Sequence, residues 1–199
     1  MTERGMIFNS EMVRAILDGR KTQTRRPVKF PVLDKNLGCE LAGNELAGEL
    51  SAGNYLNSAF GKPGDRIWVR ETFRVHSRAT DVATLVYKAS VRNSWTEQTH
   101  RVPVSVCNKP ATPEKWTPSL HMPRWASRIL LEITDVRVER LRSMSQDDAR
   151  AEGVIAASGP MEAGLAFREL WDSIYGEESW KANPWVWVIE FKRVEGGAV

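Results

Sequence analysis

Lys21 and Thr24 are the side chains best suited to chemistry, because they lie three residues apart in a strongly cationic segment. Arg20, Arg25 and Arg26 surround them, and neighbouring cations lower the pKa of a lysine by disfavouring a further positive charge. A neutral Lys21 could take the proton of the Thr24 hydroxyl and turn it into a nucleophile. The same side chains could instead bind a phosphate, by charge and by a hydrogen bond. This spacing is a weak catalytic signal, so the residues by themselves favour binding.

Glu71 is a second candidate for chemistry, because it falls within a strand predicted over residues 66–75. Alternation along that strand places Glu71 on the more apolar face, together with Val69 and Phe73. A carboxylate there needs a cationic or hydrogen-bonding partner. The partner could be an arginine with a purely structural role, or the carboxylate could belong to a functional site.

Tryptophan and arginine share the other face of the same strand, at Trp68 and Arg70. The proline-rich segment 115–125 adds more residues of both kinds: Trp116, Arg124 and Trp125. Indole rings stack on unpaired bases and cations contact phosphates, so this pattern suits a single-stranded nucleic acid. It equally suits a loop that two buried tryptophans attach to the body of the protein.

The charge of the chain is distributed unevenly. The 199 residues carry a formal net charge of +3, but residues 1–128 hold 20 Lys and Arg against 12 Asp and Glu, whereas residues 129–199 hold 8 against 13. A basic N-terminal part suggests a polyanionic partner, and a solvated mixed surface is the alternative.

The composition excludes several classes of protein. With 42% hydrophobic and 27% charged residues, the chain resembles globular proteins and not collagens, coiled coils or disordered chains. No apolar run approaches the roughly 20 residues of a membrane span, and the N-terminus lacks the apolar stretch of a signal peptide. Cys39 and Cys107 make no disulfide framework, which favours the reducing cytoplasm. The three histidines show no metal-binding spacing, so we expect no metal and no other cofactor.

Periodicity predicts three helices. One covers residues 10–17, with Ser10 as its N-cap and Gly19 as a left-handed stop. A capping box at Ser145 opens a short helix that ends near Glu152, and a longer helix covers residues 161–175. The glycines of segment 40–54 argue against a stable helix there and favour a mobile loop, one that could order over a ligand.

Alternation predicts strands in further places: 85–88 paired with 102–106, 128–134, 136–138 and 185–194. A shift of facing at Asp135 would fit a bulge or a sheet corner. The sequence therefore predicts an α+β protein, one domain over residues 1–199, built on a small and mostly antiparallel barrel.

Residues 19–26 resemble the G-x-K-x-x-T-x-R signature of the ASCH domain, a relative of the PUA RNA-binding fold. The signature positions are met by Gly19, Lys21, Thr24 and Arg26. Residues 62–65 resemble the K-x-G-D turn of the family, and the later strands and helices follow in its order. The stretches 28–61 and 76–126 look like insertions relative to the smallest members. The longer form resembles ASCH proteins that phages and prophages encode.

The resemblance implies a PUA-like β-barrel flanked by helices, with a cleft lined by the signature. PUA-like relatives bind RNA or modified bases, so Gly19, Arg20 and Arg26 would contact a nucleoside or a nucleic acid. One small ASCH enzyme type is an amidohydrolase that removes the acetyl group of acetylcytidine. Its catalytic lysine, threonine and glutamate would correspond to Lys21, Thr24 and Glu152, and a shift within the same polar helix would select Asp148 instead of Glu152.

The resulting mechanism is a hypothesis. Lys21 would activate the Thr24 hydroxyl for attack on an amide carbonyl next to the base, and Arg26 or a backbone N–H would stabilise the oxyanion. Glu152 would pass a proton to the leaving amine and later activate a water molecule.

Four functional readings stay open at this stage. The first is amide hydrolysis on an acylated nucleoside, and the second is a non-catalytic module that binds RNA, single-stranded DNA or a modified base. The third is a nuclease, which the sequence supports less well because Asp, Glu and His do not cluster as a metal site would require. The fourth is a phage accessory protein that acts on a host protein. The sequence leaves the oligomeric state and the choice between Glu71 and Glu152 open, and it predicts no membrane partner.

Overall fold

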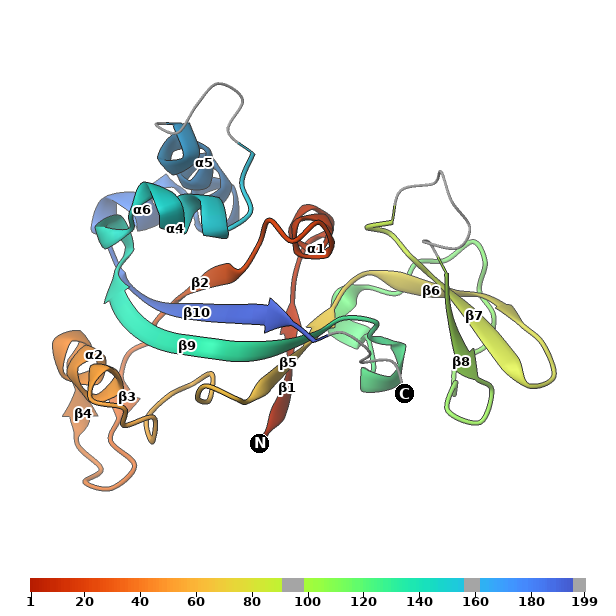
Figure 1. Ribbon diagram of the computed structural model, residues 1–199, viewed down its shortest axis with the longest axis horizontal. Coiled ribbons are helices and arrows are strands. Elements are labelled where there is room, and N and C mark those ends of the chain that lie inside the picture. Colours follow the sequence, from red (N-terminus) through yellow and green to blue (C-terminus); the bar gives the residue numbers. More distant parts are fainter. Residues whose placement is uncertain (91–98, 156–161, 195–199) are drawn as a thin grey trace. The chain divides into compact units, whose positions relative to one another are not determined.

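The computed structural model describes residues 1–90, 99–155 and 162–194 as a mixed α+β protein (Figure 1). The chain divides into two compact units. Unit 1 contains residues 1–17, 66–131 and 193–199, and unit 2 contains residues 18–65 and 132–192. The organisation predicted from the sequence, one domain over residues 1–199 with insertions at 28–61 and 76–126, stays a prediction.

Unit 1 begins with a parallel strand pair and a helix. Strand β1 (Glu3–Ile7) pairs with β5 (Arg66–Arg70), and α1 (Ser10–Leu17) follows β1. The predicted helix is confirmed, but Asn9 caps it in place of Ser10, because the Asn9 side-chain oxygen accepts the Met12 N–H at 2.8 Å. Gly19 follows the helix with a φ of +74°, the left-handed conformation that its sequence position predicts.

A three-stranded antiparallel sheet makes up most of the rest of unit 1. Its strands β6 (Phe73–Arg78), β7 (Val82–Tyr87) and β8 (Thr99–Pro103) lie in that order. A pairing in this region is present as predicted, but its register differs, because Leu85 lies opposite His100 and Val102 lies opposite Ala83. The predicted strand over 66–75 is interrupted between β5 and β6, so Glu71 lies in the gap between them, still buried as alternation predicts.

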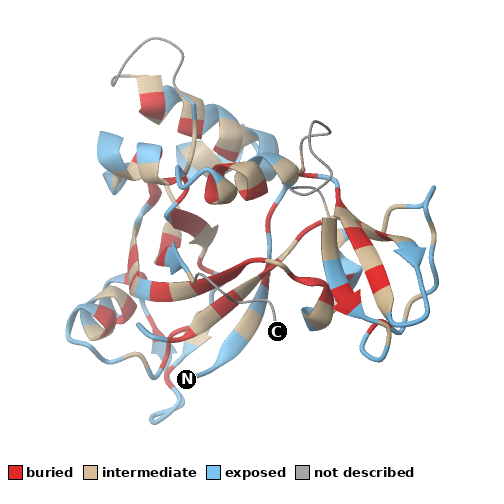
Figure 2. Cartoon of the chain, turned by 45° about the vertical axis from the view of Figure 1, so that its right-hand side comes forward, coloured by how far each residue is buried: buried red, intermediate tan, exposed pale blue. Residues whose placement is uncertain are grey.

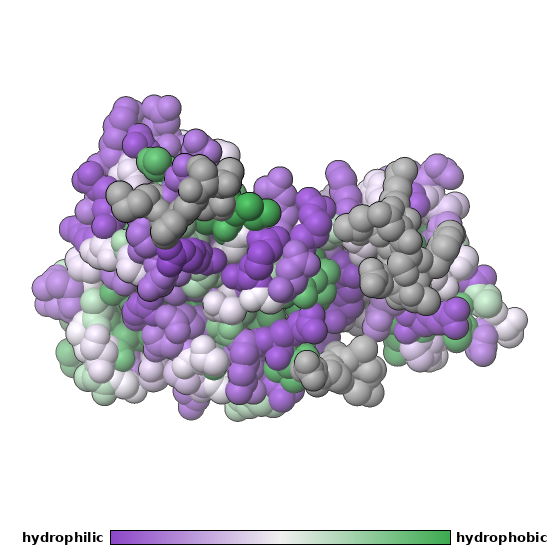
Figure 3. Space-filling view, turned by 45° about the horizontal axis from the view of Figure 1, so that its top comes forward, coloured by the Kyte–Doolittle hydropathy of each residue, from purple (hydrophilic) through white to green (hydrophobic). Residues whose placement is uncertain are grey.

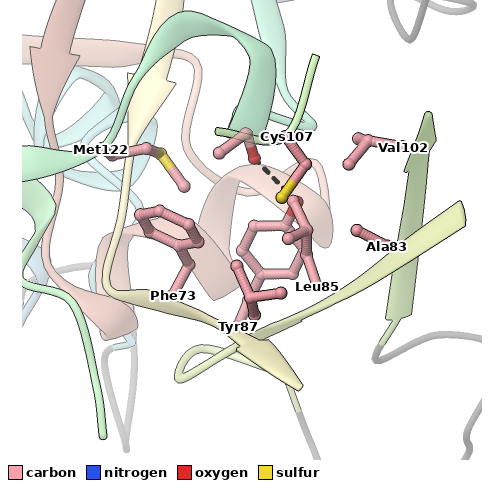
Figure 4. Close-up of a cluster of buried hydrophobic side chains, with 9 residues drawn as sticks. Phe73, Ala83, Leu85, Tyr87, Val102, Cys107 and Met122 are labelled. Carbon is pink, nitrogen blue, oxygen red and sulfur yellow. Dashed lines mark hydrogen bonds between the residues drawn. The ribbon is translucent and has the colours of Figure 1, made fainter. Parts of the chain in front are cut away.

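One hydrophobic core lies against this sheet (Figure 4). Side chains of the three strands pack there against residues of the following loop, as the close-up shows for Tyr87 and Met122. Cys107 also lies in this core, where its thiol donates to the Lys109 carbonyl at 3.5 Å. The loop contains two short 3-10 helices, η1 (Ser119–His121) and η2 (Arg124–Ala126).

Unit 2 is built on an open sheet. Most of β9 (Leu130–Arg140) and of β10 (Trp185–Arg193) lies in this unit, together with β2 (Gln23–Pro27), and their order is β9-β10-β2. The expected change of facing in β9 is present, because Ile133 and Val136 are both buried. The predicted α+β class is confirmed, but the barrel is not, because the sheets of the described residues do not close.

Three helices of unit 2 pack together, α4 (Gln146–Ala151), α5 (Ala163–Tyr175) and α6 (Glu177–Ala182) (Figure 1). The predicted capping box opens α4, since the Ser145 hydroxyl accepts the Asp148 N–H and the Asp148 carboxylate accepts the Ser145 N–H. Buried and exposed residues interleave along the helices (Figure 2), and the buried ones share a core with Val186 and Val188 of β10. A 3-10 turn, η3 (Leu141–Ser143), leads from β9 into α4.

The segment 40–54 is a helix, so the predicted mobile loop is wrong. After the short hairpin β3 (Val32–Leu33) and β4 (Glu40–Leu41), α2 (Gly43–Ser51) begins at a cap in which Glu45 accepts the Ala42 N–H at 2.8 Å. Its Leu46 and Leu50 are buried. Gly43 faces the Trp185 ring so closely that an added Cβ would lie 2.3 Å from it. Gly43 therefore allows the Trp185 ring to pack closely against α2. This packing outweighs the low helix propensity of the glycines in the segment.

Candidate functional site

The site is organised by a buried ion pair between Lys21 and Glu152, both in unit 2. A bridge joins the backbones of these two residues, and the Thr22 N–H donates to the Ala151 carbonyl at 2.9 Å. The chain before β2 is thereby attached to the end of α4. The Lys21 Nζ donates to Glu152 Oε2 and to the Glu152 carbonyl, each at 2.9 Å. The two side chains are 0% and 2% exposed, so water does not screen the pair.

Arg25 is a second cation on the same carboxylate. Its guanidinium donates to Glu152 Oε1 at 3.1 Å and to Glu139 Oε1 at 2.7 Å, and it lies 3.6 Å from Asp148. The guanidinium also lies 5.9 Å from the centre of the Phe167 ring. Sequence reasoning treated Arg25 only as a neighbouring charge. Strand alternation indicates only that Arg25 and Gln23 share one face of β2, because the carboxylate partners of Arg25 lie far along the chain.

Carboxylates of β9, β10 and α4 extend this cluster towards the surface. Arg137 joins them, with Asp148 at 3.1 Å, Asp135 at 3.2 Å and Glu139 at 3.4 Å. It also bonds Glu190. Of these residues, only Asp148 was predicted from the sequence as a candidate site residue.

Burial lowers the pKa of Lys21, and the charges of Arg26 and Arg25 lower it further, whereas Glu152 opposes the change. Burial by itself would raise the pKa of Asp148, but hydrogen bonds from Ser145 and the charge of Arg25 bring it below its usual value. A lysine with a lowered pKa that contacts a carboxylate can exchange a proton with it. Lys21 and Glu152 therefore have the geometry of an acid–base pair.

Thr24 does not join this pair. It lies opposite Ile189 in the β2–β10 ladder, and it is buried. Neighbouring residues of a strand point to opposite faces, so Thr24 faces away from the side on which Arg25 meets Glu152. Of the three predicted catalytic residues, the structure brings Lys21 and Glu152 together and places Thr24 on the other face of β2.

The remaining residues predicted to bind a nucleoside in this segment are Gly19, Arg20 and Arg26. Gly19 provides the left-handed turn before the site. Arg20 is partly exposed, donates to the Gly153 carbonyl at 2.7 Å and pairs with Asp18 at 3.0 Å. Arg26 follows Arg25 on β2, on the face that Thr24 occupies.

Glu71 belongs to a separate cluster in unit 1. Arg128 holds both of its oxygens, at 2.8 and 3.0 Å, and donates to the Ser90 hydroxyl at 2.9 Å. The guanidinium also lies 4.0 Å from the centre of the Tyr87 ring. Burial raises the pKa of Glu71, and the hydrogen bonds and charge of Arg128 oppose this change. The carboxylate partner of Lys21 is thus Glu152, and the partner of Glu71 is an arginine.

Arginine and tryptophan side chains stack in pairs on unit 1. Arg70 lies 5.4 Å from the centre of the Trp68 ring on β5, and Arg74 of β6 lies 4.6 Å from that of Trp116. The Trp68 ring lies close over Gly5 of β1, where an added Cβ would come within 2.6 Å of it. All four stacked side chains are partly accessible, although Trp68 also packs against the core of unit 1 and Arg70 donates to the Leu120 carbonyl. We call these four residues the Arg–Trp surface.

The remaining two residues of the predicted binding set are anchored differently. Trp125 packs on the core of unit 1, with its ring 6.3 Å from that of Phe73 and perpendicular to it. Arg124 pairs with Glu3 at 3.0 Å. For Trp125, the reading as a loop anchor fits the structure better than a stacking platform.

No three His, Cys, Asp or Glu side chains gather as a metal site within residues 1–90, 99–155 and 162–194. None of the helices in these ranges combines the length and the apolar composition that crossing a bilayer requires. Comparison of the chain with known protein families, with curated proteins and with solved structures finds no match.

Proposed function

We propose that this protein binds RNA or another single-stranded nucleic acid, and that the Arg–Trp surface of unit 1 holds the strand. The observation that carries the proposal is the stacking of Arg70 on Trp68 and of Arg74 on Trp116. Indole rings stack on unpaired bases of any sequence, and a base that takes the place of the arginine over a ring leaves that arginine to contact a phosphate. The excess of Lys and Arg over residues 1–128 supports a polyanionic partner.

The burial of Lys21 and of its neighbour Arg25 favours this surface over residues 19–26 as the main binding element. Lys21 and Arg25 have side chains that are 0% exposed, and both are engaged by carboxylates. A phosphate would have to displace these carboxylates, whereas the Arg–Trp surface is partly accessible as it stands.

Fluorescence anisotropy with short labelled RNA and DNA strands tests the proposal. We expect binding that weakens steeply between about 50 and 200 mM salt. The double variant Arg74→Gln with Trp116→Leu should bind about tenfold more weakly, with a shallower salt dependence. Lys192→Gln is the charge control, because Lys192 is exposed in unit 2 and pairs only with Glu132 among the described ion pairs. Equal binding by the double variant and the control would refute the proposal.

A second candidate function is hydrolysis of an N-acylated cytidine at Lys21 and Glu152. It is favoured by the 2.9 Å contact between their side chains and by the lowered pKa of Lys21. In this reaction the C–N bond of the amide breaks, the hydroxyl of a water molecule joins the acyl carbon, and its proton goes to the exocyclic amine. Glu152 would carry that proton, and Lys21 would control the charge of Glu152.

Release of cytidine from acetylcytidine tests this candidate, with Lys21→Met, Thr24→Ala and the wild-type chain compared. Loss of turnover in Lys21→Met, with circular dichroism unchanged, is expected. Loss in Thr24→Ala as well would make Thr24 the nucleophile and require it to reach the other side of β2. Absence of turnover by the wild-type chain would end the acetylcytidine hypothesis and leave nucleic-acid binding standing.

A further inference from the structure

A hollow of about 430 Å³ opens on unit 2, and none of its lining residues is Lys21, Arg25 or Glu152. Its walls come from η3, the start of α4, the first turns of α5, and α6. The lining residues are Arg142, Met144, Ser145, Gln146, Gly164, Leu165, Arg168 and Trp180. This volume lies within the range of small-molecule sites, which begins at about 300 Å³.

Hydrogen bonds fix the walls of the hollow relative to one another. The Asn183 side chain accepts the Arg142 N–H at 2.8 Å, which attaches η3 to the end of α6. Gln146 accepts the Gly164 N–H at 3.1 Å, which attaches α4 to α5. An added Cβ on Gly164 would lie 3.1 Å from the Gln146 amide, so the glycine permits this close approach. The hollow is therefore formed before any ligand arrives.

The chemistry of the lining is divided between cations and apolar groups. Arg142 has no carboxylate within ion-pair distance among the residues that the structure describes. Arg168 pairs with Asp172 through its Nε at 3.5 Å, and its guanidinium lies 5.9 Å from the centre of the Trp180 ring. Trp180 is partly accessible, and Leu165 is 62% exposed. Figure 3 shows small apolar areas among mostly hydrophilic side chains on one face of the molecule.

Two other cations of these helices are paired with carboxylates of their own helix. Lys181 pairs with Glu178 at 2.7 Å on α6, and Arg150 pairs with Asp147 on α4. Arg142 and Arg168 are thus the cations that the lining itself offers to an anion. A small anion alone would use these arginines and leave the indole and the apolar side chains without a role.

We propose that this hollow binds a nucleotide, with its phosphate between Arg142 and Arg168 and its base against Trp180. Guanidinium groups bind phosphate through paired, charge-assisted hydrogen bonds, and indole rings stack on bases. The apolar side chains of Met144 and Leu165 would cover the edge of the base and the ribose. The site is independent of the Arg–Trp surface, and its ligand is either a free mononucleotide or the phosphorylated end of a strand.

Isothermal titration calorimetry of the full chain tests the proposal with AMP, CMP, adenosine and inorganic phosphate. We expect the monophosphates to bind at least about tenfold more tightly than adenosine or phosphate, because only they use both halves of the lining. Arg142→Gln should weaken binding of the monophosphates about tenfold, and Trp180→Phe should weaken it less. Lys181→Gln, which removes an equal charge beside Trp180 but outside the lining, should leave binding unchanged. Dinucleotides with and without a 5′-phosphate then distinguish a free nucleotide from a strand end as the source.

Three outcomes would overturn the proposal: no heat of binding at millimolar nucleotide, equal affinity for phosphate and the monophosphates, or unchanged affinity in Arg142→Gln. The double variant Arg74→Gln with Trp116→Leu should retain mononucleotide binding. If that variant loses it, the nucleotide binds on unit 1 and the hollow is not its site. These variants therefore distinguish failure of the hollow as a nucleotide site from failure of the Arg–Trp surface as a nucleic-acid site.

Discussion

The two units each bury one glutamate, and they stabilise its charge in different ways. In unit 2, Glu152 receives a lysine and an arginine on different oxygens, at 2.9 and 3.1 Å. In unit 1, Glu71 receives one arginine on both oxygens, at 2.8 and 3.0 Å. Both arrangements satisfy the hydrogen-bonding capacity of a buried carboxylate, which burial would otherwise penalise heavily.

The two pairs differ in whether the cation that binds the glutamate can release a proton. An arginine keeps its proton under all ordinary conditions, so the Arg128–Glu71 pair can hold structure but cannot transfer a proton from its cation. A buried lysine can lose its proton, and the pKa of Lys21 is lowered. Only the pair of unit 2 therefore has the means for acid–base chemistry, although both carboxylates are buried to a similar degree.

The surroundings of the two pairs also differ. Arg128 is held by a tyrosine ring and a hydroxyl, which are neutral groups. Arg25 connects Glu152 to Glu139 and, less closely, to Asp148, and Arg137 adds further carboxylates. A change at Glu152 thus reaches several charges, whereas a change at Glu71 reaches one.

Glu152→Gln should have the largest effect on stability. It removes the negative charge that compensates Lys21 and Arg25, whose side chains are 0% exposed. Breaking a buried ion pair from one side costs about 3–5 kcal/mol, so we expect a loss of that order in the free energy of unfolding. Urea denaturation at neutral pH measures it. A cost below that of Glu71→Gln would mean that Lys21 is already neutral in the folded protein.

Glu71→Gln should cost less, about 2–3 kcal/mol, which is typical for lost hydrogen bonds to a charged group. Arg128 is 12% exposed and keeps its contacts with Ser90 and Tyr87, so it stays partly compensated. The same urea titration applies, and Arg128→Met with Glu71→Gln is the matched control. If the double variant is as unstable as the single one, an unpaired Arg128 is not the source of the loss.

The pH dependence of stability should have opposite signs for the two clusters. The pKa of Lys21 lies below its ordinary 10.5, so between these values the unfolded chain binds a proton that the folded chain lacks, and stability rises with pH. The pKa of Glu71 lies above its ordinary 4.5, so in that window the folded chain binds the extra proton, and stability falls as pH rises.

Each slope reaches at most about 1.4 kcal/mol per pH unit for one proton. Unfolding free energies measured across the pH range should lose the alkaline rise in Lys21→Met and the acidic fall in Glu71→Gln. Loss of the alkaline rise in Glu71→Gln instead would contradict this assignment of the two slopes.

Sequence reasoning found the elements whose patterns are local. The helix at 10–17, the capping box at Ser145 and the burial of Glu71 follow from periodicity or from neighbouring residues, and all are present. The helix α2 was missed because it depends on Gly43 meeting Trp185, residues far apart in the chain. No local pattern reveals such a contact.

The difference between local patterns and contacts of distant residues also explains which site residues could be predicted. The resemblance to the ASCH signature selected Lys21 and Glu152, and these two residues are in contact. Strand spacing alone could not choose between Glu71 and Glu152, because the choice depends on which cation lies opposite each of them in the fold. The role of Arg25 was missed for the same reason, since its partners Glu139 and Glu152 come from later parts of the chain.

Ser145→Ala should have the smallest effect on the free energy of unfolding, and this effect should be confined to unit 2. Ser145 caps α4, the helix whose end presents Glu152 to Lys21, and losing such a cap costs about 1 kcal/mol. Glu71 lies between two strands and depends on no helix cap, so its cluster should be unaffected. Hydrogen exchange can separate the two, because amides of α4 should exchange faster in Ser145→Ala while those of β5 and β6 do not. Ser145→Thr, which keeps a hydroxyl at the cap, should restore protection of α4. If it does not, the loss in Ser145→Ala does not come from the missing hydroxyl, and the position of Glu152 does not depend on this cap.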